Sequence, residues 1–231
     1  MKGKDLCDLK SCFLCSNSVS AWLASIKAHK TNLDIKKGEA VFEEGQKAKG
    51  IFFLYSGRVK VHKRWDHQKE LILKFAKKGD ILGFRGLGNE KIYPVTAIAL
   101  EPVTVCFIDL TFFEDMLKAN HLLTFQLMKF YANELQEAET RIRDLAHMDV
   151  KGRLADTLIQ LKKQFGHNKD GIINIKLTRQ DIASYAGTTY ETVFRIMQDL
   201  TKRKIIKVTG KNIIILNELK LKELALPEKQ K

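Results

Sequence analysis

The chain has 231 residues, of which 45% are hydrophobic and 29% are charged, and it contains only 3 Pro. This composition is typical of a globular protein and excludes an intrinsically disordered chain. The first twenty residues lack the apolar core of a signal peptide, and no run of about 18 apolar residues occurs, so we expect a cytoplasmic protein that does not enter the membrane. The formal net charge of +13 favours a polyanionic partner.

A short arm at residues 1–20 holds three of the four cysteines and precedes a series of short β-prone segments. Between residues 33 and 109, glycines separate these segments at short intervals, a spacing typical of a β-barrel or β-sandwich. Apolar residues alternate in 58–65 and in 70–76, which predicts a hairpin. We therefore expect a small β-barrel over residues 21–120.

Residues 121–148 contain no Gly or Pro and predict one long helix, along which apolar residues recur at steps of three or four. Such a stripe packs either on the barrel of the same chain or against a second chain, as the seam of a coiled coil. Because a helix of this length extends beyond what a small barrel can cover, we expect a homodimer. The predicted interface residues are Leu127, Tyr131, Leu135, Ala138, Ile142 and Leu145.

The remaining chain predicts a second domain over residues 149–220 and a tail over 221–231. It is the more basic part, because residues 149–231 hold 17 Lys or Arg against 9 Asp or Glu. In residues 178–203, Thr178 is a good N-cap and Gly187 is suited to the turn between two short helices. Small or apolar residues stand where these helices must touch, which predicts a helix-turn-helix: Ile182, Ala183, Ala186, Val193 and Ile196.

The second helix of such a motif enters the major groove of DNA with its N-terminal part. Glu191 and Arg195 lie on one face of that helix, where the carboxylate can accept from cytosine N4 and the guanidinium can donate to guanine O6 and N7. The alternative is an ordinary salt bridge between residues four apart. The start of the first helix can grip phosphate, and a basic turn in the hairpin that follows either grips the DNA backbone or supports the motif. The predicted DNA-binding residues are Thr178, Arg179, Gln180, Thr188, Thr189, Tyr190, Glu191, Phe194, Arg195 and Lys211.

A β-barrel, a long helix and a winged helix-turn-helix in this order resemble the family of the cyclic-AMP receptor protein and the anaerobic regulator FNR. The motifs that carry the resemblance are GDILG at 79–83, MDVKGRL at 148–154, LTRQDI at 177–182 and ETVFRI at 191–196. The resemblance implies an α+β fold with an N-terminal β-roll or jelly-roll sensory domain, a long dimerisation helix and a C-terminal winged helix-turn-helix domain. It also implies a homodimeric transcription regulator that contacts RNA polymerase and binds palindromic double-stranded DNA, reading a G-A step with Glu191 and Arg195.

The effector pocket departs from that of the nucleotide-binding members of this family. In those members, the segment that matches 79–83 is followed by a Glu that holds the ribose and later by an Arg-Ser or Arg-Thr pair that grips the cyclic phosphate. Phe84 and Tyr93-Pro94 stand at these positions here. Because an anionic phosphate needs a cation or N–H donors, these residues argue against cyclic AMP as the effector. The altered pocket comprises Gly83, Phe84, Arg85, Tyr93 and Pro94.

The four cysteines offer another way to sense a signal. Cys7, Cys12 and Cys15 cluster in the arm, and Cys106 lies in a segment, 99–108, that resembles the FNR segment with its fourth iron–sulfur ligand. The resemblance implies a redox or oxygen sensor with a [4Fe-4S] cluster, although the C-x4-C-x2-C spacing of the arm differs from that of FNR. Zinc binding, reactive thiols and the absence of any cysteine role are the alternatives.

Two other classes of function fit the sequence less well. A cupin-like metalloenzyme would need a His-x-His pair with a spaced Glu, and the six histidines instead suggest scattered surface residues, so we expect no enzymatic activity. A cyclic-nucleotide-binding regulatory module without DNA function would keep the phosphate-binding Arg and would not need residues 178–216. The sequence does not identify the effector or any cofactor.

Overall fold

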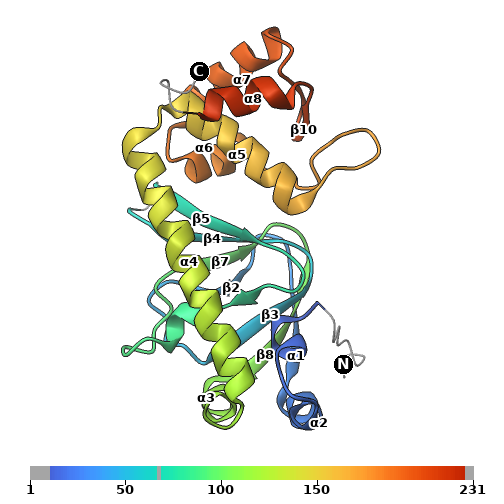
Figure 1. The fold of residues 1–231 in the computed structure, drawn as a ribbon, viewed down its shortest axis with the longest axis vertical. Helices are drawn as coiled ribbons and strands as arrows, with labels where there is room; N and C mark the ends of the chain where they lie inside the picture. Colours follow the sequence, from blue (N-terminus) through green and yellow to red (C-terminus); the bar gives the residue numbers. More distant parts are fainter. Residues whose placement is uncertain (1–10, 67–68, 227–231) are drawn as a thin grey trace. The chain divides into compact units, whose positions relative to one another are not determined.

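The computed structural model describes residues 11–66 and 69–226 (Figure 1). The chain divides into two compact units, an N-terminal unit, Met1–Leu135, and a C-terminal unit, Gln136–Lys231. The N-terminal unit contains α1 (Phe13–Ser16), α2 (Ser20–His29), β1 (Thr31–Ile35), β2 (Ala40–Phe42), β3 (Gly50–Ser56), β4 (Val59–Arg64), β5 (Glu70–Ala76), β6 (Ile81–Leu82), η1 (Phe84–Leu87), β7 (Thr96–Ala99), β8 (Val103–Asp109), α3 (Leu110–Ala119) and the first half of α4 (His121–His147). The C-terminal unit contains the rest of α4, α5 (Val150–Phe165), α6 (Arg179–Ala186), α7 (Tyr190–Lys202), β9 (Ile206–Thr209), β10 (Asn212–Ile215) and α8 (Glu218–Ala225).

The strands of the N-terminal unit form two four-stranded antiparallel sheets (Figure 1). Their strand orders are β1-β8-β3-β6 and β2-β7-β4-β5. Apolar side chains of both sheets are buried in one core, among them Phe53 of β3 and Val59 of β4. The expected α+β fold, with a β-sheet domain, a long helix and a helix-turn-helix domain, is confirmed. Among the described residues, no helix is both long and apolar enough to cross a membrane.

The predicted hairpin is present as the antiparallel pair β4 and β5, but its register changes within the strand. A β-bulge lies between Val61 and His62, and both of these neighbours are buried. In a regular strand they would point to opposite faces of the sheet. The bulge therefore turns His62 inward, and the expectation that all histidines lie on the surface is wrong for this one.

Helix α4 packs on the barrel of its own chain along one line, which includes Leu123 and Leu127. Leu127, which we expected in the dimer interface, is only 5% exposed and belongs to the barrel core. The next residue, Met128, is 58% exposed. One residue turns a helix by about 100°, so the outward stripe starts one position later than the sequence suggested.

The division between the two units lies inside α4, whereas the sequence analysis placed the domain boundary at 148/149. The second half of α4 packs within the C-terminal unit. Arg141 donates to the carbonyl of Tyr185 at 2.7 Å, and its guanidinium lies 4.4 Å from the Tyr185 ring centroid. Near the C-terminus of the chain, α8 packs on α5 and buries Leu221. The folded domain therefore extends into residues 221–225, which we expected to belong to the tail.

Candidate nucleic-acid interface

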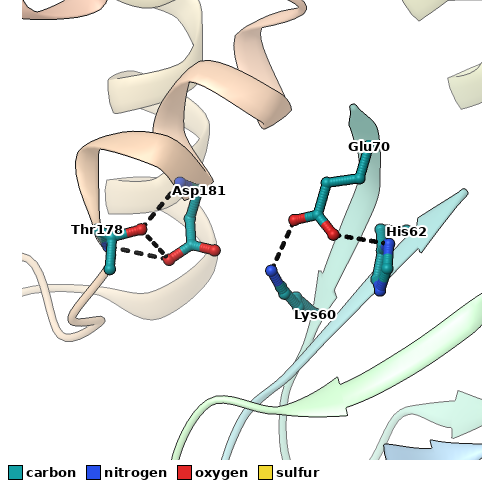
Figure 2. A network of polar contacts seen from close by, with 5 residues as sticks. All are labelled: Lys60, His62, Glu70, Thr178 and Asp181. Carbon is teal, nitrogen blue, oxygen red and sulfur yellow. Dashed lines mark hydrogen bonds and ion pairs between the residues drawn. The ribbon is translucent and has the colours of Figure 1, made fainter. Parts of the chain in front are cut away.

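Local hydrogen bonds place the two helices of the helix-turn-helix. Thr178 Oγ1 accepts from the N–H of Asp181 at 3.0 Å, and the Asp181 carboxylate accepts from the N–H of Thr178 at 3.0 Å, which forms a capping box at the start of α6 (Figure 2). Gly187 ends α6 in the left-handed conformation, with φ 65°. Thr189 then caps α7 by accepting from the N–H of Thr192. The Thr178 hydroxyl, which we expected at a phosphate, is therefore engaged within the protein.

Apolar side chains hold α6 against α7. The predicted contacts Ile182, Ala183, Ala186 and Val193 are buried. Ile196, also predicted there, is only half-buried. The inner face of α7 instead continues at steps of four and three residues from Val193, through Met197 and Leu200.

The opposite face of α7 is exposed and carries the side chains expected to read DNA. Glu191 and Arg195 both lie on it, and within the described chain no ion pair within 4.0 Å joins them. Both groups are thus available to base edges. Gln198, one turn further along this face, is also exposed, and it was not among the predicted residues because these cover only the first two turns. A glutamine amide can pair with adenine N6 and N7.

The remaining predicted DNA contacts surround this helix. Arg179, at the start of α6, donates to the carbonyl of Gly210 at 2.9 Å and so joins α6 to the turn between β9 and β10. Its neighbour Gln180 and the turn residue Lys211 are exposed. Thr188 is half-buried. The C-terminal unit therefore presents exposed polar and cationic groups around α7.

Hydrogen bonds from Arg153, which were not predicted from the sequence, fix the turn of the motif. The guanidinium of Arg153 on α5 donates to three carbonyl oxygens, those of Met148 at 2.6 Å, Ala186 at 2.9 Å and Gly187 at 3.2 Å. A Cβ at Gly187 would lie 2.5 Å from Leu145 Cδ2, so Leu145, expected in the dimer interface, packs on its own chain. These contacts hold α7 at a set position relative to the end of α4.

The five residues predicted for the effector pocket line one small cavity in the N-terminal unit. Its volume is about 10 Å³, roughly the space for one water. Tyr93 fills the site, because its ring stacks on Phe42 at 4.3 Å between centroids and its hydroxyl donates to the carbonyl of Gly50 at 2.7 Å. Burial raises the pKa of Tyr93. The other lining residues are Val61, Lys74, Leu82, Gly83, Phe84, Arg85, Pro94 and Val95.

The wall of this cavity is bound to the first half of α4. Arg85 pairs with Glu134 at 3.0 Å, and Lys74 contacts the same carboxylate. The Tyr131 hydroxyl donates to the carbonyl of Phe84 at 2.6 Å, and burial raises the pKa of Tyr131. These contacts join the barrel to the first half of α4.

The described cysteines do not form one ligand set. Cys12 is half-buried and precedes α1, whereas Cys15 is buried within it. Cys106 is buried on β8, where its Sγ donates to Asn32 Oδ1 at 3.2 Å. Cys7 lies outside the described residues. Within residues 11–66 and 69–226, no group of three or more His, Cys, Asp or Glu side chains could hold a metal ion.

A second polar cluster lies on the hairpin of β4 and β5 (Figure 2). His62 Nδ1 lies 2.9 Å from Glu70 Oε2, and Lys60 Nζ lies 2.7 Å from Glu70 Oε1. The contact with His62 is the main reason that the pKa of Glu70 falls to about 2; burial opposes this change, and Lys60 adds to it. The contacts with His62 and Lys60 satisfy the charge of the Glu70 carboxylate within the sheet.

Known proteins match both units. Residues 33–120 match the family model of the cyclic nucleotide-binding domain, and residues 152–224 match that of the Crp-like helix-turn-helix domain. The chain is 35% identical over 191 residues to an "Anaerobic regulatory protein" of Bacillus subtilis, covering 81% of this chain and 80% of that protein. It is 32% identical over 174 residues to the "cAMP-activated global transcriptional regulator CRP" of Pasteurella multocida, covering 74% and 83%. The solved structure of FixK2 from Bradyrhizobium japonicum has the same fold, with a TM-score of 0.77 at 23% identity over 86% of this chain and 98% of that one.

Proposed function

The chain belongs to the CRP/FNR family of DNA-binding transcription regulators, and we propose that it acts as a homodimer on a palindromic site. The observation that carries the DNA-binding part is the exposed face of α7, where Glu191 and Arg195 stand free of each other on a helix fixed by caps and by Arg153. A carboxylate and a guanidinium one turn apart can read cytosine N4 and guanine O6 and N7. Two such heads related by a two-fold axis would address half-sites about 34 Å apart.

An exposed apolar stripe on α4 supports the dimer. Met128, Leu135 and Ile142 follow one another at intervals of seven residues and are 58%, 60% and 66% exposed. Tyr131 lies three residues after Met128, and Ala138 lies three residues after Leu135; both are exposed. Positions that alternate by three and four along a helix form the seam of a coiled coil. We define the seam by these five residues, in which Met128 replaces Leu127 and from which Leu145 is omitted.

The effector is proposed to be something other than cyclic AMP. A cyclic nucleotide needs a cation for its phosphate, and both cations at the cavity, Lys74 and Arg85, already contact Glu134. It also needs room, and Tyr93 fills the cavity. Membership of the family supports RNA polymerase as a partner, a cytoplasmic location and the absence of a catalytic role.

Redox sensing is the second candidate. It is favoured by the names of two relatives, the "Anaerobic regulatory protein" already described and a "Fumarate and nitrate reduction regulatory protein" of Vibrio cholerae, 31% identical over 193 residues. Cys12, Cys15 and Cys106 do not form one ligand set, and Cys7 lies outside the described residues, so we assign no regulatory step to an iron–sulfur cluster. The iron and acid-labile sulfide content of protein purified without oxygen tests this candidate. Near four of each per chain would support a cluster-based sensor, and iron-free protein would rule it out.

Selection of duplexes from a random library by the full chain tests the DNA-binding proposal. We expect an inverted repeat whose half-sites contain a G-A step. Arg195→Ala should then weaken binding to the selected duplex by about 1–3 kcal/mol and change binding to random DNA little. Lys220→Ala is the matched control, because it removes the same charge from an exposed position on α8. Equal losses on selected and random DNA would rule out direct reading by Arg195.

A further inference from the structure

Two aromatic side chains on α7 are left open to solvent. Tyr190 is 43% exposed and Phe194 is 45% exposed. Their rings stack, with centroids 6.2 Å apart and planes 12° from parallel, so they form one continuous apolar surface. Large aromatic side chains are usually buried, and an apolar patch on a surface marks a contact with something else.

The position of this patch on the helix indicates what it meets. At about 100° per residue, Tyr190 and Phe194 lie on one flank of Glu191, and Arg195 lies on the other. All four belong to the first two turns, the part of a recognition helix that enters the major groove. Phe194 has no polar atom and cannot hold a phosphate. The patch is therefore placed to contact base edges beside those that Glu191 and Arg195 can read.

The chemistry of the major groove leaves one apolar feature for such a surface. Of the four bases, only thymine presents a methyl group there, and the other base edges present hydrogen-bond donors and acceptors. We propose that Tyr190 and Phe194 determine specificity by packing on thymine methyl groups next to the bases contacted by Glu191 and Arg195. This inference rests on the proposed function and adds to it the class of base that the flanking positions require.

Replacing thymine by deoxyuridine tests the inference, since it removes only the methyl group and preserves base pairing. The probe is the duplex selected by the wild-type chain, with each thymine pair exchanged symmetrically in both half-sites. We expect a roughly fourfold loss of affinity for each methyl that is buried, and hence roughly 16-fold for a symmetric exchange. Exchanges at thymines outside the half-sites should have no effect.

Protein variants assign the loss to the two rings. With Phe194→Ala or Tyr190→Ala, the duplexes with thymine and with deoxyuridine should bind equally well at the position that the missing ring contacts. Lys220→Ala is the control, because it alters an exposed residue of α8, outside the reading face of α7, and should leave the penalty for deoxyuridine intact. Circular dichroism checks that each variant keeps the helical content of the wild type.

Several results would overturn the inference while leaving the proposed function in place. These are a selected inverted repeat without thymine beside the G-A step, equal binding of the thymine and deoxyuridine duplexes by the wild type, or a penalty that both alanine variants retain. DNA binding that neither alanine variant changes would assign the patch to a protein partner instead. Failure of the wild type to select any inverted repeat would overturn the proposed function and this inference together.

Discussion

Replacing Leu135 by glutamate should dissociate the proposed dimer. Complete burial of a leucine side chain contributes about 1.5–3 kcal/mol, and Leu135 still exposes 60% of its surface in the single chain. Burying that remainder in the seam is worth about 1–2 kcal/mol, and both copies contribute. The loss is therefore about 2–4 kcal/mol per dimer, equivalent to a rise in the dimer Kd of roughly 30- to 900-fold. Desolvation of the two new carboxylates increases it further.

Sedimentation velocity over a range of protein concentrations measures this change, and DNA binding gives a second readout. The monomeric variant should lose affinity for the palindrome while its affinity for an isolated half-site stays the same. Asn133→Glu is the matched control, because it places the same charge two residues away at an exposed position outside the seam. If Leu135→Glu sediments like the wild type, or if Asn133→Glu dissociates the dimer as strongly, the stripe on α4 is not the interface.

Four further predictions concern stability and the cavity. Glu70→Gln should destabilise the N-terminal unit by about 1–3 kcal/mol at pH 7. The difference from the wild type should shrink as the pH falls from 4.5 towards 2, because the lowered pKa of Glu70 stabilises the fold only while the carboxylate is charged. Urea unfolding followed by tryptophan fluorescence measures the difference, since both tryptophans lie in this unit. Asp181→Ala should remove the capping box and destabilise the helix-turn-helix by about 1 kcal/mol, seen as faster hydrogen exchange of the first turn of α6. Tyr93→Ala should lower the free energy of unfolding by about 3 kcal/mol, because it opens a cavity. Calorimetric titration of the wild type with cyclic AMP should show no saturable binding at micromolar concentrations.

The helix-turn-helix was predictable because its determinants are close together in the sequence. The capping pair Thr178 and Asp181 is three residues apart, and the left-handed turn needs Gly187 itself. The inner and outer faces of α7 follow from the helical repeat, which is why the positions of Glu191 and Arg195 on the exposed face could be anticipated. The sequence in this region contains nearly all the information that its local structure requires.

Contacts between distant segments were not predictable in the same way. The bonds from Arg153 to Ala186 and Gly187 join residues more than thirty positions apart. The filling of the cavity by Tyr93 depends on Phe42 of β2 and Gly50 of β3, which are distant from it in the sequence. A single sequence contains no periodic signal for such pairs, because each partner is selected by how the sheets and helices pack.

The sequence by itself determined the order of the parts, the amphipathic character of α4 and the chemistry offered to DNA, because these depend on residue type and on spacing within a helix or strand. Only the tertiary structure decided which side of α4 and of β4 faces inward. The barrel covers Leu127 and leaves Met128 exposed, and the bulge in β4 buries His62 beside Val61. Turning a helix or strand by one residue barely alters its fit to the hydrophobic pattern, but it changes which side chain meets the core. Packing against residues distant in the sequence therefore determines which side chain is buried.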